Sequence, residues 1–257
     1  MTKTMLFLTM LLVTAVYPLK AAWSKTLTIA VIDSGIDGSL PNLCKFGHKS
    51  FVKTLPNPLV DENGHGTHVA GLINSTAGIG NYCIVAIKFY DPSATGWANL
   101  GSILKAVQYA INIKVDFINI SGGGPEFNLK ERNLILKALN NKITVVTAAG
   151  NENDDLDKEC NYFPACYDPR IIMVGNLRTT SLIESWSANG LEIASVNVRV
   201  RSTERTPSSN YGNRVTRWEI GTNVLSTLPG GRMGRMTGTS QATAIATGKL
   251  VRERLSR

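Results

Sequence analysis

The architecture of this chain depends on the segment Leu27-Thr28-Ile29-Ala30-Val31-Ile32-Asp33-Ser34-Gly35. Its first six residues form a mostly apolar, β-branched run, which is typical of a strand buried on both faces of a parallel sheet. Asp33 follows at the carboxyl end, and Ser34-Gly35 begins a turn. The segment therefore predicts an inner strand that delivers a carboxylate to one edge of a sheet.

Around this strand, apolar runs alternate with segments of helical periodicity. The predicted strands are residues 27–32, 84–90, 115–120, 143–148 and 170–174. The predicted helices begin at His65 and cover 102–113, with Ser102 as N-cap, 129–140 and 239–255. Residues 36–64 are predicted to be rich in turns and residues 196–217 to form a basic surface loop or hairpin. This alternation predicts an α/β fold of three layers, a mostly parallel central sheet with helices on both faces.

The length and charge of the chain narrow the classes of function. A chain of 257 residues is suited to one sizeable domain, and its formal net charge is +8. Lys and Arg are scattered without a long basic run, which favours a basic exported protein over a nucleic-acid binder. The alternative, binding to nucleic acid or an anionic surface, depends on the net charge and on the arginines of residues 196–217.

The N-terminus has the pattern of a secretory signal peptide. Lys3 supplies a positive charge, and residues 5–16 are an apolar run that is too short to span a bilayer comfortably. Pro18 interrupts the run, and Ala21-Ala22 offers small residues for cleavage. We predict a signal peptide over 1–22, one domain over 23–257, a secreted or periplasmic location and no stable membrane association after cleavage. The alternatives are a buried helix or a membrane anchor.

Four cysteines fit an oxidising compartment. Cys160 and Cys166 are close enough in sequence to close a surface loop, and Cys44 would then pair with Cys83. Four cysteines allow three connectivities, and the sequence alone does not choose among them. The absence of a C-x-x-C motif and the presence of only three histidines argue against a metal site.

Three short segments carry chemically distinct groups on glycine-framed turns. An acid, an imidazole and a hydroxyl occur in this order, in Val31-Ile32-Asp33-Ser34-Gly35, Gly64-His65-Gly66-Thr67-His68-Val69-Ala70-Gly71 and Gly238-Thr239-Ser240-Gln241-Ala242. A serine hydroxyl needs a base within hydrogen-bond reach to act as a nucleophile. Each segment also has a structural reading: a turn aspartate, a structural histidine and a helix N-cap.

In this order and with these flanks, the segments resemble the subtilisin-like serine proteases, or subtilases (peptidase family S8). The resemblance covers most of residues 27–250. It implies that Ser240 is the nucleophile, that His65 is the general base and that Asp33 orients and stabilises the imidazole, while His68 is structural. The implied function is an exported serine endopeptidase that forms an acyl-enzyme on Ser240 and acts on protein or peptide substrates as a monomer, without binding nucleic acid.

The resemblance also implies substrate-binding residues. Thr147-Ala148-Ala149-Gly150-Asn151 matches the oxyanion segment of the family, so Asn151 is the expected side-chain donor and the Ser240 N–H the second donor. Ser121-Gly122-Gly123 matches the strand that pairs with the substrate backbone, which an extended peptide would lengthen. Ala149 and Gly150 are expected to contact the substrate as well.

Several positions depart from the family pattern. Gln241 and Ala244 stand where Met and Pro are usual, and no pro-domain is evident. The segment 74–82 is short where many relatives carry a calcium loop, so calcium binding stays open, no site is assigned and no other cofactor is expected. These departures are also compatible with a second interpretation, in which a catalytically weak or inactive subtilase fold binds peptides or a partner.

An acidic stretch follows the expected oxyanion residue. It contains Glu152, Asp154, Asp155, Asp157 and Glu159. In the family this stretch lies beside the pocket for the residue before the scissile bond, so one hypothesis is a preference for Lys or Arg there. The alternatives are a solvated acidic loop and a calcium loop.

Overall fold

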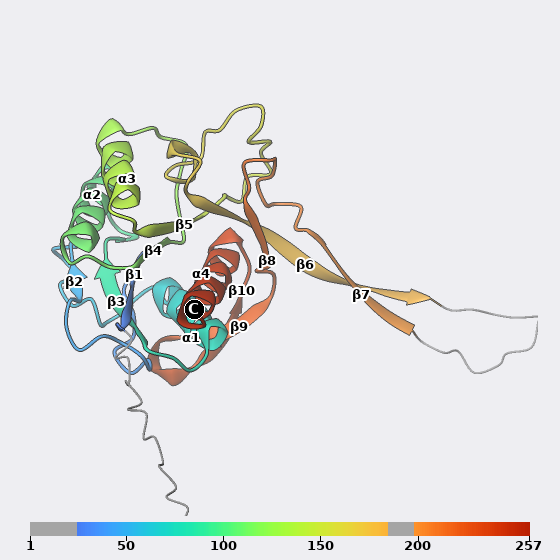
Figure 1. The fold of residues 1–257 in the computed structure, drawn as a ribbon, viewed down its shortest axis with the longest axis horizontal. Coiled ribbons are helices and arrows are strands. Elements are labelled where there is room, and N and C mark those ends of the chain that lie inside the picture. The colour runs from blue at the N-terminus through green and yellow to red at the C-terminus, as the bar shows by residue number, and fades with distance from the viewer. Residues whose placement is uncertain (1–24, 185–197) are drawn as a thin grey trace, which may run out of the picture.

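A sheet of eight strands runs through the protein, with strand β1 (Leu27–Asp33) in its interior (Figure 1). A computed structural model describes residues 25–184 and 198–257, so the predicted signal peptide lies outside the described residues. The strand order is β2-β3-β1-β4-β5-β6-β7, and β8 pairs with β6 beside this path. Every pairing is parallel except β6 with β7.

The other elements follow the predicted alternation closely. The remaining strands of this sheet are β2 (Lys49–Ser50), β3 (Tyr82–Lys88), β4 (Phe117–Ile120), β5 (Thr144–Ala148), β6 (Ile172–Glu184), β7 (Val198–Arg205) and β8 (Arg217–Ile220). A separate hairpin consists of β9 (Val224–Thr227) and β10 (Met233–Met236). The helices are α1 (His65–Ala77), α2 (Gly96–Asn112), α3 (Leu129–Asn140) and α4 (Thr239–Leu255).

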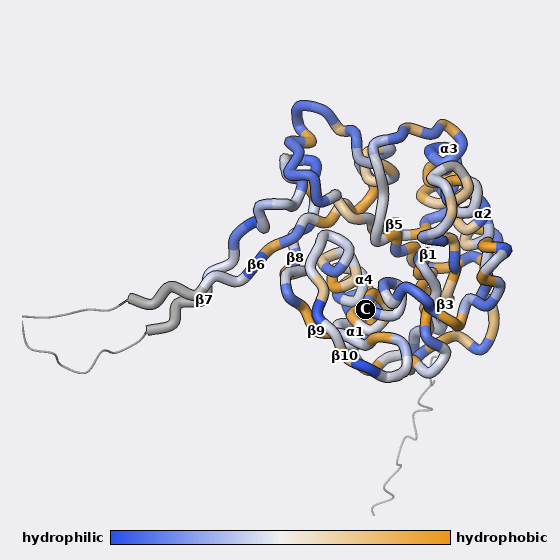
Figure 2. The backbone as a smooth tube through the Cα atoms, turned by 180° about the vertical axis from the view of Figure 1, so that it is seen from behind, coloured by the Kyte–Doolittle hydropathy of each residue, from blue (hydrophilic) through white to orange (hydrophobic). Residues whose placement is uncertain are grey.

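Strand β1 is buried on both faces because helices cover both sides of the sheet. Ala30 and Ile32 pack in a core cluster with α2 and α3, whereas Ile29 and Val31 pack in a second cluster with α1 and α4. Figure 1 shows these two helix pairs on opposite sides of the strands, and Figure 2 shows apolar residues concentrated between them. The predicted three-layer α/β fold with a mostly parallel sheet is confirmed.

Helix α4 packs tightly against α1, and its small residues make this possible. A Cβ on Gly248 would lie 2.7 Å from the backbone oxygen of Ile73 and 2.7 Å from Cβ of Thr76. Ala242, Ala244 and Ala246 are buried as well. A larger residue at position 248 would push the two helices apart, so the small residues of this helix have a packing reason.

The predicted start of the second helix was wrong. Helix α2 begins at Gly96, and the side chain of Thr95 is its N-cap, accepting a hydrogen bond from Ala98 N at 3.3 Å. Ser102 lies inside the helix, where its Oγ donates to Phe51 O at 3.1 Å. The sequence pattern did not reveal that the helix begins at Gly96, because glycine is unfavourable in a helix and suggests a loop.

Strand β6 continues ten residues beyond the predicted Val174 and forms a long antiparallel hairpin with β7. The hairpin stem projects away from the body of the protein (Figure 1). The sequence of this hairpin lacks the apolar run that marked the inner strands, so only the hairpin alternative for residues 196–217 anticipated it. The described part of that segment contains β7, a loop and the first residue of β8.

The structure contains the disulfides Cys44–Cys83 and Cys160–Cys166. This is the pairing in which Cys160 and Cys166 close a short loop. The first ties the loop that follows β1 to β3, and the second closes a short loop before β6. Across residues 25–184 and 198–257, no helix combines the length and the hydropathy needed to cross a membrane.

Candidate active site

Several of the expected site residues lie at the carboxyl edge of the sheet. Asp33 ends β1, Ser121 directly follows β4, and Asn151 comes three residues after β5. Strands β3 and β4 flank β1 on its two sides, so the chain reverses its direction of winding there. In open α/β sheets, ligands bind beyond the carboxyl ends of the strands at such a point.

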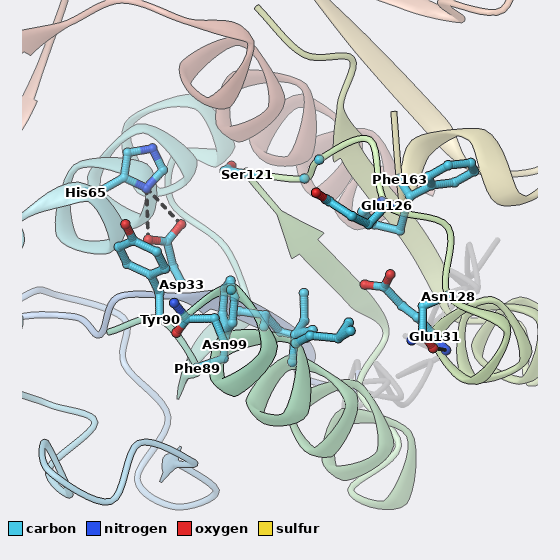
Figure 3. Close-up of a pocket in the computed structure, with 18 of the residues that line it drawn as sticks. Asp33, His65, Phe89, Tyr90, Asn99, Ser121, Glu126, Asn128, Glu131 and Phe163 are labelled. Atoms are coloured by element: carbon cyan, nitrogen blue, oxygen red, sulfur yellow. Dashed lines mark hydrogen bonds and ion pairs between the residues drawn. The ribbon is translucent and has the colours of Figure 1, made fainter. Parts of the chain in front are cut away.

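Asp33 and His65 are directly hydrogen-bonded. His65 Nδ1 lies 2.8 Å from Oδ1 and 3.0 Å from Oδ2 of Asp33 (Figure 3). Because a carboxylate only accepts, Nδ1 carries the proton, and in the neutral imidazole Nε2 is left as the basic nitrogen. The Asp33 side chain is nearly buried, and the backbone N–H of Ser34 also donates to its Oδ1 at 2.7 Å.

Two glycines allow the turn after β1 to approach the start of α1. Gly35 has φ of +117°, and a Cβ there would lie 2.6 Å from Val60 O and 2.7 Å from Cε of Lys88. A Cβ on Gly66 would lie 2.1 Å from the oxygen of Gly35. Without these glycines, Asp33 and the first turn of α1 would be held too far apart for the hydrogen bond.

Asp61 connects the same two segments. Its buried carboxylate accepts from Ser34 Oγ at 2.9 Å, Asn63 N at 3.2 Å, Gly64 N at 2.8 Å, and Thr67 N and Oγ1 at 2.9 and 2.6 Å. Ser34 Oγ in turn accepts from Gly66 N at 3.0 Å. Asp61 thus holds the turn after Asp33 against the start of α1.

The acidic surroundings of His65 change its basicity. The negative charge of Asp33 is the main cause that raises the pKa of His65, and their hydrogen bond and the charge of Asp61 act in the same direction. Burial opposes this effect but does not overcome it. By contrast, burial lowers the pKa of His68, whose Nε2 lies 3.2 Å from Gly234 O. The pKa values of the two histidines are therefore shifted in opposite directions.

Ser240 lies in the first turn of α4 and contacts the segment after β4. Its Oγ donates to Ser121 O at 2.7 Å, and Ser121 Oγ donates to Ser240 O at 3.1 Å. Asn119 Nδ2 donates to Ser121 Oγ at 2.9 Å, and Thr247 Oγ1 donates to Asn119 Oδ1 at 2.8 Å. In the described part of the chain, no hydrogen bond joins Ser240 to His65. Catalytic hydrogen bonds are often long or misaligned without substrate.

Asn151 lies beside the Ser240 turn with a defined amide orientation. Its Oδ1 accepts from Thr239 N at 2.9 Å and from Thr239 Oγ1 at 3.2 Å. Because the backbone N–H can only donate, the amide oxygen must face Thr239 and the NH₂ group faces away from it. Asn151 therefore has a side-chain donor available at an exposed position next to Ser240.

Gly122 and Gly123 are accessible at the surface, whereas the preceding Ser121 is buried. The next residue, Gly124, is different, because its backbone pairs with that of Phe163. The two N···O distances are 3.0 and 2.8 Å. Gly122 and Gly123 themselves have no backbone hydrogen-bond partner among the described residues. An extended peptide could pair with such an edge.

Ala149 and Gly150 directly precede Asn151, and their carbonyl groups are held by Asn210. Asn210 Nδ2 donates to Ala149 O at 2.9 Å, and Asn210 N donates to Gly150 O at 3.1 Å. Gly150 has φ of +103°. These two residues do not line the cavity described next, so their expected contact with substrate stays a prediction.

A cavity of about 880 Å³ adjoins the Asp33–His65 pair. Figure 3 shows Asp33 and His65 toward one side, with Glu126, Glu131 and Phe163 across the cavity from them. Ser121, Gly122 and Gly123 line it as well. A volume of this size fits a ligand larger than a single small group.

The acidic stretch after Asn151 binds neighbouring loops. Asp157 accepts from Asn213 N at 2.8 and 2.9 Å and from its Nδ2 at 2.9 Å, while Glu152 Oε2 accepts from Asn210 Nδ2 at 2.8 Å. None of the five acidic residues lines the large cavity. In the described ranges, no group of three or more His, Cys, Asp or Glu side chains is placed to hold a metal ion.

The family of the chain follows from a match to a family model. The model for the subtilase family of peptidases matches residues 24–253. The chain belongs to the subtilase family. The order of acid, imidazole and hydroxyl that suggested the family is thus part of a match over nearly the whole chain.

Individual relatives support the same family assignment. Subtilisin from Bacillus pumilus is 35% identical over 227 residues, which cover 86% of this subtilase and 74% of that protein. Subtilisin amylosacchariticus from Bacillus subtilis subsp. amylosacchariticus is 34% identical, with coverage of 86% and 53%. This subtilase therefore spans about half the length of that relative. An intracellular serine protease from Paenibacillus polymyxa is 33% identical over 248 residues, with coverage of 90% and 68%.

A solved structure shows the same fold. The crystal structure of a cold adapted subtilisin-like serine proteinase superposes with a TM-score of 0.64 and 25% sequence identity. The superposition covers 86% of this subtilase and 72% of that chain.

Sequence reasoning missed two buried polar residues that position this site, Asp61 and Asn119. Asp61 precedes His65 by four residues within the turn-rich segment, where aspartate is common and gives no specific signal. Asn119 interrupts an apolar strand, and a polar residue in an inner strand is a usable signal because it needs a buried partner. In this subtilase that partner is Thr247.

Proposed function

We propose that this chain is a serine endopeptidase whose catalytic residues are Asp33, His65 and Ser240. The observation that carries the proposal is the contact of His65 Nδ1 with both carboxylate oxygens of Asp33 at the mouth of a large cavity. This contact fixes the tautomer in which Nε2 can accept a proton. The family membership and the position of Ser240 at the start of α4 support the same assignment.

The proposed reaction has two halves. Ser240 Oγ forms a bond to the carbonyl carbon of the scissile peptide while its proton passes to His65 Nε2. The C–N bond then breaks, the leaving amine takes that proton, and an acyl-enzyme remains. Water, activated by His65, hydrolyses the ester and restores the Ser240 hydroxyl. Asp33 stabilises the imidazolium that forms in both halves.

The oxyanion of each tetrahedral intermediate needs fixed donors. We assign this role to the NH₂ group of Asn151 and the backbone N–H of Ser240. The hydrogen bonds from Thr239 to Asn151 Oδ1 support the assignment, since they hold the amide before substrate arrives. Substrates would be proteins or peptides paired with Ser121, Gly122 and Gly123.

A second candidate function, peptide binding without catalysis, is favoured by one contact. Ser240 Oγ donates to Ser121 O and not to the imidazole. In the first candidate, a rotation of the Ser240 side chain brings Oγ to His65 when substrate binds. In the second, the serine stays in this contact and remains unreactive.

The two candidates are separated by a fluorophosphonate probe. If Ser240 is activated, its Oγ displaces fluoride from phosphorus, and the probe becomes covalently attached. We expect labelling of the parent protein at Ser240, located by mass spectrometry of its peptides, and no labelling of the Ser240→Ala variant. A parent protein that is folded by circular dichroism but is not labelled at Ser240 would contradict the peptidase proposal.

We further propose that the protein is exported through a signal peptide over residues 1–22. The apolar run near the N-terminus and the two disulfides in the described region support this proposal. N-terminal sequencing of protein recovered from the periplasm or the medium is expected to begin at Trp23. Recovery of the whole pool from the cytoplasm with residues 1–22 attached would contradict it.

A further inference from the structure

The far end of the large cavity contains two carboxyl groups that the proposed reaction does not use. Glu131 lies in the first turn of α3 and Glu126 in the loop before it, and both line the cavity. Figure 3 shows both side chains across the cavity from Asp33 and His65. Apart from His65, none of the described residues that line the cavity has a basic side chain. The ionisable side chains at this end of the cavity are therefore acidic.

Glu131 is almost fully buried, with 5% of its surface exposed. Its Oε2 accepts a hydrogen bond from Tyr167 Oη at 2.7 Å, while Oε1 has no hydrogen-bond partner among the described residues. Burial raises the pKa of this carboxyl group, and the hydrogen bond from Tyr167 offsets this effect only in part. The position near the N-terminus of α3 supplies some compensation, but no Lys or Arg of the described chain pairs with it.

Glu126 differs from Glu131 in exposure but shares the absence of a cation. Its side chain is exposed at the cavity, and no ion pair or hydrogen bond of its carboxylate occurs in the described residues. The carboxylates of Glu126 and Glu131 thus lie in the same cavity, one at the surface and one in its wall. A cation that enters the cavity would meet both an accessible and a desolvated partner.

The walls between the two ends of the cavity are largely apolar. Ile103 and Leu100 of α2 and Phe89 at the end of β3 contribute aliphatic and aromatic surface, and Phe127 and Phe163 contribute aromatic rings near the glutamates. The side chains of Lys and Arg have apolar stems that pack along such walls while the charged head reaches a polar partner. A guanidinium group also stacks favourably on aromatic rings.

We propose that the Glu126–Glu131 end of this cavity is a subsite for a Lys or Arg side chain of the bound peptide. The inference rests on the proposed function, because it places a peptide along Ser121, Gly122 and Gly123. The apolar walls hold the stem of the side chain, and the two carboxylates bind its cation. One position of the peptide would therefore be selected for positive charge, and the five acidic residues of 152–159 would play no part in this selection.

The test compares arginine with citrulline, which has nearly the same shape without the charge. Internally quenched peptides carry one Arg or one citrulline at successive positions along an otherwise apolar sequence. At one position we expect kcat/KM for the Arg peptide to exceed that for the citrulline peptide by about tenfold or more. The ratio should fall toward one in Glu131→Gln and in Glu126→Gln, and should persist in Glu159→Gln, which removes an exposed carboxylate outside the cavity.

The outcomes separate this inference from the proposed function. Peptides that are cleaved with a ratio near one at every position would overturn the subsite and leave the peptidase intact. A ratio that survives when both glutamates are replaced would overturn it as well. If nothing is cleaved, fluorescence anisotropy of the same peptides on Ser240→Ala measures the ratio of dissociation constants, with the same two criteria. Glu126→Gln decides the matter if Glu131→Gln does not fold, because Glu126 is exposed.

Discussion

The His65→Ala variant will hydrolyse peptides about 10⁶-fold more slowly than the parent protein at saturating substrate, if the triad is as proposed. Removing the imidazole leaves Ser240 without a base and the leaving amine without an acid, so both halves of the reaction lose proton transfer. The measurement is kcat for one internally quenched peptide, with a purification that excludes contaminating proteases.

A matched control is His48→Gln, which replaces a histidine outside the large cavity. The imidazole of His48 lies 2.7 Å from Cys44 O and accepts from Ala86 N at 3.0 Å, and the amide of glutamine can also donate and accept. This variant should keep kcat close to that of the parent. A His65→Ala protein that retains more than about one hundredth of the parental kcat would show that His65 is not the base.

The Asp33→Asn variant is expected to lose about 10⁴-fold in kcat and to change its pH dependence. An amide can donate to the imidazole where the carboxylate only accepted, so the tautomer with a free Nε2 is no longer enforced. The charge of Asp33 is also the main cause of the raised pKa of His65. Since the reaction needs neutral His65, kcat/KM of the parent rises with pH through this raised pKa, and the rise should move to lower pH in Asp33→Asn.

Asp61→Asn separates the effect of charge from the effect of orientation. It removes a second negative charge that raises the pKa of His65 but leaves both partners of the Asp33–His65 hydrogen bonds unchanged. We expect a shift of the pH profile in the same direction and a smaller loss of kcat than in Asp33→Asn. Equal losses of kcat in the two folded variants, or a shift of the profile to higher pH in Asp33→Asn, would contradict the assigned role of Asp33.

The inner elements of the fold could be predicted because their signals are local. The strand over residues 27–32 is covered on both faces, and such a strand needs apolar residues at most positions. Helices α3 and α4 begin and end at the predicted residues. In each of them the helical pattern begins directly after a cap residue, Asn128 for α3 and Gly238 for α4. The β6–β7 hairpin beyond Val174 carries no such apolar run, because its two strands are held by pairing with each other.

The candidate site was predictable in its residue types but not in its contacts. The glycine-framed order of Asp33, His65 and Ser240 identified the family before any fold was known. The support that Asp61 and Asn119 provide could not be anticipated in the same way. Each of them works through hydrogen bonds to groups distant in sequence, and a buried polar residue reveals its purpose only through its partner.

The sequence by itself therefore determined the class of the fold, the family and the groups available for chemistry. Only the tertiary structure decided that Asp33 and His65 meet, that Ser240 Oγ donates to Ser121 O, and that Glu126 and Glu131 share a cavity with the His65 imidazole. The physical reason is the range of the interactions. Periodicity and turn chemistry act over a few residues, whereas a site at the edge of a parallel sheet is assembled by packing segments that are far apart along the chain.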